Sequence, residues 1–158
     1  MPRKDAIFDR MDGSYWYSCF DLLSGYYSIR MRAKDISSAF QAPEELFEYI
    51  TVPMGLSNAP ATLNRIVQRI FEDLRDNVTT YFDDVYVFTN ETDVKAHLPA
   101  VRCVFERCRE KKLFLKVSKY TICAAEIPCL GDFAGRQGVC IVPDKVRVVR
   151  EWPRPKTI

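Results

Sequence analysis

The sequence predicts an α+β fold in which helices pack on one face of a β-sheet. Two segments, 15–22 and 78–88, are rich in β-branched and aromatic residues, which is typical of strands. Between them, residues 63–74 repeat apolar side chains at helical spacing. Strands and helices alternate along the chain, and acidic residues fall at strand ends, which suits helices layered on a sheet.

The first half of the chain begins with a predicted amphipathic helix over residues 4–11, in which Ile7, Phe8 and Met11 are apolar. A strand is expected next, over residues 15–22. Residues 26–32 are predicted to form a turn or short helix that continues as a strand. Residues 39–42 and 47–52 are predicted to pair as a hairpin around Pro43-Glu44-Glu45.

A longer helix is predicted after Asn58, which caps it, with Pro60 in the first turn, where a missing N–H costs little. Its apolar stripe is expected to face the core rather than to bind a ligand. The stripe consists of Leu63, Ile66, Val67, Ile70, Phe71 and Leu74.

The second half opens with a helix predicted from about Thr92 to Lys111. Pro99 falls within it, so the helix either starts late or is kinked there. The side chains expected to face inward are Val94, Leu98, Val101, Phe105 and Cys108. The remaining elements are predicted as a strand over 113–117, a hairpin of 129–133 with 138–142 around 135–137, and a short helix from Pro143 through Val149.

Two adjacent carboxylates, Asp83 and Asp84, stand between strand-like runs at 78–82 and 85–88. On one continuous strand they would point to opposite faces, whereas a tight turn at Asp83-Asp84 places both at the tip of a hairpin. Unpaired acids in an apolar segment repel each other and resist burial, and a divalent cation such as Mg²⁺ relieves both effects. The alternative is a solvated Asp-Asp turn.

A third acid, Asp21, interrupts another apolar run at 18–23 and precedes the turn signal Ser24-Gly25. One acid from a strand and two from a hairpin tip would suit a two-metal site, because phosphoryl transfer with two ions needs carboxylates from different elements. The alternative for Asp21 is a strand-end acid that faces water.

A chain of 158 residues, 47% of them hydrophobic, can bury one core, so we expect a single domain over residues 1–158. Basic and acidic residues nearly balance, 23 against 21, so nucleic acid would have to be attracted by local basic stripes. Such clusters, for which a solvated surface is the simpler explanation, are Lys111, Lys112, Lys116 and Lys119, and Arg147, Arg150, Arg154 and Lys156.

The cysteine and histidine content argues against a structural zinc site. The chain has six cysteines without a Cys-x-x-Cys pair, and a single histidine, His97. Several cysteines lie in apolar runs, so we expect a reducing intracellular compartment, cytoplasm or nucleus. No apolar run reaches the roughly 18 residues of a membrane span, so no membrane partner is expected.

Five segments resemble, in order, the palm motifs of reverse transcriptases. The first three are FDLLSGYYSI at 20–29, VPMGLSNAPAT at 52–62 and the YFDD box at 81–84. The later two are LKVSKY at 115–120 and CLGD at 129–132, and WPRPKT at 152–157 resembles the stretch that leads out of the palm. Order and spacing over about residues 2–157 resemble the gypsy class of long-terminal-repeat retrotransposon polyproteins.

The resemblance implies a polymerase palm, which is a ferredoxin-like antiparallel sheet with helices on one face, plus a partial fingers hairpin within an insertion at about residues 33–55. It implies RNA-directed DNA polymerase activity, in which a primer 3′-hydroxyl attacks a nucleotide. The implied partners are an RNA/DNA template-primer and deoxynucleotides. Asp21 and Asp83 would be the principal ligands of Mg²⁺ or Mn²⁺, and Asp84 the supporting acid.

The nucleotide pocket is assigned by the same resemblance. Tyr26 would stack under the incoming sugar and exclude a 2′-hydroxyl, although core packing beside Tyr27 is a real alternative. Met54 and Gly55 would line the pocket for the nucleotide.

On the primer side, Leu130-Gly131 and the hairpin that follows would hold the primer strand. Lys119 would contact a phosphate, with surface solvation as the alternative. Two residues depart from the family pattern: Leu63 stands where an aromatic residue is usual, and Asp132 replaces a common histidine. An acid at Asp132 would repel the phosphates of the primer.

The resemblance also implies that N-terminal fingers strands, most of a thumb and a ribonuclease H domain are absent from residues 1–158. A second hypothesis is therefore a domesticated, non-catalytic reverse-transcriptase-like module that binds protein or nucleic acid. Unprotected apolar surface and sheet edges would favour association with itself or with a partner.

Overall fold

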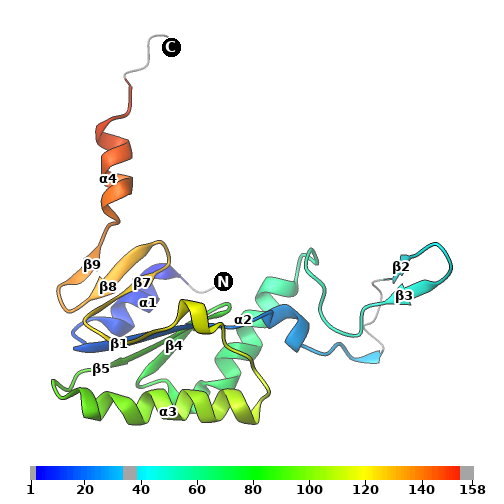
Figure 1. The fold of residues 1–158 in the computed structure, drawn as a ribbon, viewed down its shortest axis with the longest axis horizontal. Helices are drawn as coiled ribbons and strands as arrows, with labels where there is room; N and C mark the ends of the chain where they lie inside the picture. The colour runs from blue at the N-terminus through cyan, green and yellow to red at the C-terminus, as the bar shows by residue number, and fades with distance from the viewer. Residues whose placement is uncertain (1–2, 34–38, 154–158) are drawn as a thin grey trace.

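A four-stranded antiparallel sheet forms the centre of the computed structural model, which describes residues 3–33 and 39–153 (Figure 1). Its strand order is β4-β5-β1-β6, and every neighbouring pair is antiparallel. With one helix between β1 and β4 and another between β5 and β6, the order matches the predicted ferredoxin-like palm. The strands are β1 (Trp16–Asp21), β4 (Val78–Tyr81), β5 (Asp84–Thr89) and β6 (Thr121–Ala124).

Two helices, α2 (Ala59–Ile70) and α3 (Val94–Glu110), cover one face of this sheet, as the sequence predicts. Alternate residues of β1 and β5 point toward them, because successive side chains of a strand face opposite ways. The buried cluster between sheet and helices consists of Phe20, Leu22, Leu63, Val67, Phe71, Val78, Val85, Val87, Val101, Val104 and Cys108.

The other face carries a second layer, made of α1 (Lys4–Met11) and a small antiparallel sheet, β7-β8-β9. Its strands are β7 (Glu126–Cys129), β8 (Asp132–Gly135) and β9 (Gly138–Cys140). The second buried cluster consists of Ile7, Met11, Tyr17, Cys19, Tyr86, Phe88, Ile127, Cys129 and Ala134. The central sheet is therefore covered on both faces, by two helices on one and by one helix with a small sheet on the other.

Two elements project from this body (Figure 1). The hairpin of β2 (Ala39–Gln41) and β3 (Leu46–Glu48) corresponds to the predicted fingers hairpin. The second is helix α4 (Pro143–Arg150), which begins at the predicted proline and buries none of its residues. Residues 34–38 of the predicted insertion, together with Arg154 and Lys156 of the predicted basic cluster, lie outside the described residues.

Several predicted boundaries are wrong. Helix α2 ends at Ile70, and the apolar stripe continues into a separate 3₁₀ turn, η3 (Glu72–Leu74). Helix α3 starts at Val94 and continues through Pro99, and the side chain of Asp93 caps it by accepting a hydrogen bond from the N–H of Lys95 at 2.9 Å. Leu98, which was predicted to face inward, is 49% exposed, and the neighbouring His97 is buried instead.

The predictions after α3 also need correction. Residues 113–117 form no strand, and only Leu115 bridges to Leu22. A 3₁₀ turn, η4 (Val117–Lys119), and β6 follow. The predicted final hairpin is a three-stranded meander with turns at 130–131 and 136–137. The predicted strand 129–133 is wrong, because the turn at 130–131 divides it between the end of β7 and the start of β8. No helix in residues 3–33 and 39–153 combines the length and apolar character needed to cross a membrane.

Candidate active site

Strand pairing brings two of the three predicted acids together. Asp21 ends β1 and Asp84 begins β5, and the two residues are direct partners across the antiparallel pair. Partner residues point to the same face, so both carboxylates lie on the face opposite α2 and α3. The preceding pair, Phe20 with Val85, points the other way into the core.

Asp83 lies beside this pair, in the turn between β4 and β5. The two turn residues are Phe82 and Asp83, because Tyr81 pairs with Asp84, so the turn is one residue earlier than the predicted Asp83-Asp84. Phe82 has φ of +54°. The carbonyl of Asp83 accepts a hydrogen bond from the N–H of Leu22 at 2.8 Å, which fixes the turn against the end of β1.

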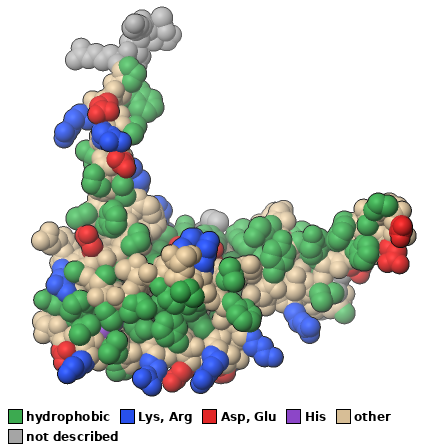
Figure 2. All heavy atoms as spheres, in the orientation of Figure 1, with side chains coloured by type: hydrophobic (Ala, Val, Ile, Leu, Met, Phe, Trp, Pro, Cys, Tyr) green, Lys and Arg blue, Asp and Glu red, His purple; other side chains and the backbone are tan. Residues whose placement is uncertain are grey.

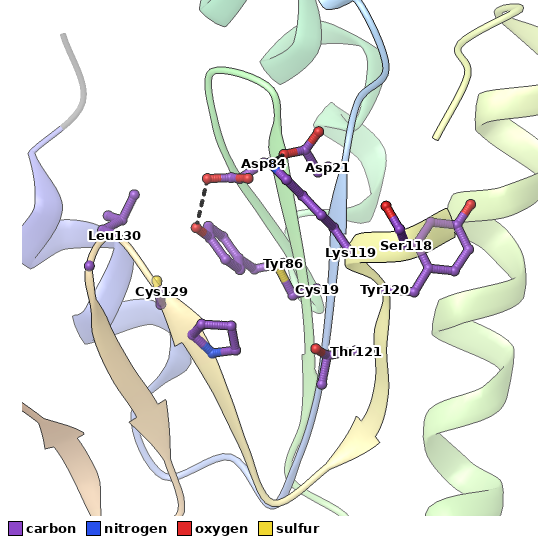
Figure 3. A pocket seen from close by; sticks show the side chains of 12 residues that line it. Cys19, Asp21, Asp84, Tyr86, Ser118, Lys119, Tyr120, Thr121, Cys129 and Leu130 are labelled. Carbon is purple, nitrogen blue, oxygen red and sulfur yellow. Dashed lines mark hydrogen bonds and ion pairs between the residues drawn. The ribbon is translucent and has the colours of Figure 1, made fainter. Parts of the chain in front are cut away.

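The environment of Asp84 disfavours its charged form. Burial raises the pKa of the Asp84 carboxyl, and the negative charges of Asp83 and Asp21 raise it further. The hydroxyl of Tyr86 donates a hydrogen bond to Asp84 Oδ2 at 3.1 Å and opposes this shift (Figure 3). Asp84 therefore interacts electrostatically with both other predicted acids, although Asp21 lies far from it in the sequence.

Lys119, at the end of η4, supplies the positive charge at this site. Its ammonium group donates a hydrogen bond to Asp21 Oδ2, which raises the pKa of Lys119; the charges of Asp84 and Asp83 contribute in the same direction. The Asp21 side chain is 16% exposed, whereas that of Lys119 is 54% exposed. The ion pair thus joins a largely buried acid to a base that reaches it from the surface.

These groups line a pocket of about 480 Å³ (Figure 3). Of the predicted site residues, Asp21, Asp84, Lys119, Leu130 and Gly131 line it. Asp21, Asp84 and the predicted primer-side turn therefore face the same space, whereas Asp83 is not among the residues that line it. The full lining is Cys19, Asp21, Asp84, Tyr86, Ser118, Lys119, Tyr120, Thr121, Pro128, Cys129, Leu130 and Gly131.

The turn at Leu130-Gly131 is held from two sides. Both residues have positive φ, 53° and 85°, as a two-residue type I′ hairpin turn requires. Lys4 of α1 donates a hydrogen bond to the Leu130 carbonyl at 2.6 Å, and Lys145 of α4 donates to the Gly131 carbonyl.

The charge of Asp132 is balanced within the chain. Lys145 Nζ lies 2.8 Å from Asp132 Oδ1 and lowers the pKa of that carboxyl. The repulsion expected between Asp132 and phosphate is therefore offset by a neighbouring lysine, which the sequence prediction did not pair with it.

Among the pocket residues that were not singled out from the sequence are Tyr86, Cys19 and Cys129. Tyr86 contacts Asp84, and the thiols of Cys19 and Cys129 lie beside them. Burial raises the pKa of Cys19 to about 12 and that of Cys129 to about 11, so both thiols are protonated at neutral pH. Strand alternation would have identified two of the three, because Cys19 is two residues before Asp21 and Tyr86 two after Asp84.

The predicted nucleotide-pocket residues do not line this pocket. Tyr26 follows Gly25 in the 3₁₀ turn η1 (Gly25–Ser28) and is partly buried against the helix-side core. A Cβ at Gly25 would lie 3.8 Å from that of Asp83, so η1 passes close to the acids. Met54 is 62% exposed, and Gly55 adopts φ of +102° with open space around it.

Oxygen-only donors and clustered negative charge fit a hard divalent cation such as Mg²⁺ or Mn²⁺. Across the described ranges, however, no three His, Cys, Asp or Glu side chains are arranged so that they could hold a metal ion as they stand. Lys119 occupies an oxygen of Asp21, and Tyr86 occupies one of Asp84. The residues thus fit the ion by chemistry, and binding requires the carboxylates to turn toward it.

Comparison with known sequences places this site in a family. A family model described as reverse transcriptase (RNA-dependent DNA polymerase) matches residues 2–148. The enzymatic polyprotein of Cestrum yellow leaf curling virus is 33% identical over 133 residues, which are 83% of this chain and 20% of that polyprotein. The retrovirus-related Pol polyprotein from transposon 297 of Drosophila melanogaster is 29% identical over 157 residues, 98% of this chain and 15% of that polyprotein.

Solved structures agree on the fold. A foamy viral protease-reverse transcriptase in complex with double-stranded DNA matches with a TM-score of 0.86 at 19% identity, covering 100% of this chain and 28% of that one. The same kind of protein in complex with an RNA/DNA hybrid gives 0.79 at 18% identity, covering 95% and 20%. The chain spans about a fifth of the Cestrum yellow leaf curling virus polyprotein and 15% of the transposon 297 polyprotein. It belongs to the reverse transcriptase (RNA-dependent DNA polymerase) family.

Proposed function

We propose that this chain forms the palm of an RNA-directed DNA polymerase, which extends a primer 3′-hydroxyl with deoxynucleotides on an RNA or DNA template. The observation that supports it most strongly is the register between β1 and β5, which pairs Asp21 with Asp84 and sets Asp83 beside them. The order of the motifs further supports an origin in a gypsy-class long-terminal-repeat element.

In this proposal Asp21 and Asp83 bind the divalent ions and Asp84 supports them. Held by these residues, divalent ions would supply Lewis acidity, which would lower the pKa of the primer hydroxyl and stabilise charge on the nucleotide phosphate. Tyr86 orients the Asp84 carboxylate through its hydroxyl, and the buried core beneath Phe20 and Val85 keeps the two strand ends in register. The chain's own contribution is therefore the placement of negative charge at one end of a rigid strand pair.

The nucleotide and the primer would approach from different elements. We assign Tyr26 to the incoming sugar, supported by the close approach of η1 to Asp83, and Met54 and Gly55 to the nucleotide pocket. We assign the Leu130-Gly131 turn to the primer strand, supported by its place in the same pocket as Asp21 and Asp84.

Primer extension tests this function. The chain would be assayed on an RNA template with a DNA primer, Mg²⁺ or Mn²⁺ and deoxynucleotides, beside Asp83→Asn and a control, Asp5→Asn. Asp5 is an exposed acid of α1 outside the pocket. We expect weak extension that Asp83→Asn abolishes and Asp5→Asn leaves unchanged, and equal incorporation by all three would reject the catalytic assignment.

A second candidate is a non-catalytic module that associates with itself or with a partner. It is favoured by the projecting hairpin of β2 and β3, which carries hydrophobic side chains on its surface (Figure 2). In this hairpin Phe40 stacks on Phe47 with ring centroids 5.7 Å apart, and Leu46 is 68% exposed. Light scattering after size exclusion tests it, and a monomer at high concentration would count against it. The free thiols of all six cysteines support an intracellular, reducing location as part of either proposal.

A further inference from the structure

A cation already stands among the three acids. The ammonium group of Lys119 donates to Asp21 Oδ2, and both side chains line the same pocket as Asp84. One positive charge from the chain itself thus faces the carboxylates to which the proposed function gives the divalent ions.

We propose that Lys119 is an internal counter-ion that competes with the divalent cation for Asp21. The inference rests on the proposed function, in which Asp21, Asp83 and Asp84 bind that ion. An ammonium and a divalent ion on the same carboxylate repel each other strongly at such short distances. Lys119 must therefore leave Asp21 when the ion binds, and the ion binds more weakly than the acids alone would allow.

The surroundings of Lys119 allow this exchange without refolding. Its backbone is fixed, since the N–H of Lys119 donates to the Lys116 carbonyl at 3.0 Å and the N–H of Lys116 donates to the Asp21 carbonyl at 2.9 Å. Its side chain is more than half exposed, so the ammonium can rotate into water, whereas Asp21 stays largely buried. The short tether keeps the ammonium at a high local concentration beside the acid, which makes it an effective competitor.

The exchange also has a consequence for anionic ligands. A displaced Lys119 remains anchored by η4 at the edge of the same pocket, together with Ser118 and Gly131. Loading of the divalent ion therefore frees one positive charge where an anionic ligand can use it. Ion binding and anion binding at this pocket become coupled through one side chain.

Calorimetric titration with Mn²⁺ tests the competition directly, without requiring activity. The variant is Lys119→Met, and the matched control is Lys116→Met. Lys116 lies three residues before Lys119, carries the same charge, and is exposed outside the pocket lining. Both variants would first be checked by thermal unfolding. We expect Lys119→Met to bind Mn²⁺ about fivefold more tightly than the wild type, and Lys116→Met to match the wild type.

A second readout follows the side chain itself. Addition of Mg²⁺ should shift the NMR signal of the Lys119 Cε methylene, assigned by its loss in Lys119→Met, and should leave that of Lys116 in place. Equal Mn²⁺ affinities of the wild type and Lys119→Met would overturn the inference. Equal tightening by both substitutions would overturn it too, because it would indicate general charge repulsion rather than competition at Asp21.

Asp21→Asn separates this inference from the proposed function. If Asp21→Asn abolishes Mn²⁺ binding while Lys119→Met has no effect, the counter-ion role is wrong and the metal site stands. If neither the wild type nor Lys119→Met binds Mn²⁺, the metal site of the proposed function is wrong, and the counter-ion role is wrong with it.

Discussion

Replacement of His97 by leucine is expected to destabilise the fold that holds the acids in place. His97 is fully buried on α3, with Nε2 2.8 Å from Ser18 Oγ and Nδ1 2.9 Å from Thr89 Oγ1. Ser18 also accepts a hydrogen bond from the N–H of Cys123 at 3.0 Å. The network therefore ties α3 to β1, β5 and β6, and Ser18 is three residues before Asp21 on the same strand.

The magnitude follows from the partners that leucine leaves behind. Leucine is close to histidine in volume, so the change in packing is small, but two buried hydroxyls lose a partner. A buried polar group without a hydrogen bond costs about 1–3 kcal/mol. Ser18 keeps its bond from Cys123, so its loss lies at the low end, and Thr89 loses the one side-chain contact described for it. We expect a total loss of about 2–4 kcal/mol.

Urea unfolding of the wild type and His97→Leu measures this loss as a lower midpoint at unchanged slope. The matched test is Thr89→Val, which should cost stability in the wild type and restore about 1 kcal/mol in His97→Leu, where the hydroxyl has no partner. A loss below about 1 kcal/mol in His97→Leu, or an equal effect of Thr89→Val in both backgrounds, would show that the hydrogen bonds of His97 do not stabilise the fold.

Three further predictions concern pH, a close contact and a charge. Burial lowers the pKa of His97 below its ordinary 6.5, so the unfolded chain takes up the proton first as the pH falls. The free energy of unfolding should therefore decline as the pH falls from about 6.5 toward the pKa of the folded state. Urea midpoints of His97→Leu should not show this decline. Gly135→Ala places a Cβ 2.7 Å from the Cβ of Glu126 on the paired strand. In the same assay it should lower the free energy of unfolding by about 1–3 kcal/mol. An unchanged urea midpoint would contradict this close approach of the two strands. Lys145→Met leaves the charge of Asp132 unneutralised beside the turn that is proposed to hold the primer. Fluorescence anisotropy should therefore show that the Lys145→Met variant binds an RNA/DNA duplex more weakly than the Lys145→Arg variant does. Equal binding by the two variants would indicate that the turn does not contact the duplex.

The hairpin that carries Asp83 and Asp84 could be predicted only in part from the local sequence pattern. Two neighbouring acids between strand-like runs predict a turn, and the turn is there. Its register is not readable, because it places Phe82 at φ of +54°, a conformation that turn statistics assign to Gly, Asn or Asp. The pairing of Asp21 with Asp84 depends on that register, so the contact emerges only from the folded sheet.

Buried polar groups explain the error in α3. Apolar spacing selects Leu98 for the inner face, but the helix buries His97 instead. Its partners, Ser18 and Thr89, belong to two different strands and satisfy both ring nitrogens. Periodicity ranks side chains by hydrophobicity alone and has no means of detecting partners 79 and 8 residues away.

The pocket itself could be anticipated only in part. The resemblance suggested Lys119 and the Leu130-Gly131 turn as separate contacts, and the structure places both in the pocket that Asp21 and Asp84 line. The strand that carries the turn into position, β7, has four residues and contains Pro128, which a sequence reading discounts. Proline is tolerated there because β7 is the edge strand of its sheet.

Anomalous scattering from crystals soaked in Mn²⁺ would show whether Asp21, Asp83 and Asp84 share divalent cations. We predict a manganese peak bounded by the carboxylates of these residues, with the Lys119 ammonium withdrawn from Asp21, and no such peak in Asp21→Asn. Crystals of the wild type that show no manganese at these carboxylates, at an Mn²⁺ concentration sufficient for primer extension, would contradict the proposed chemistry.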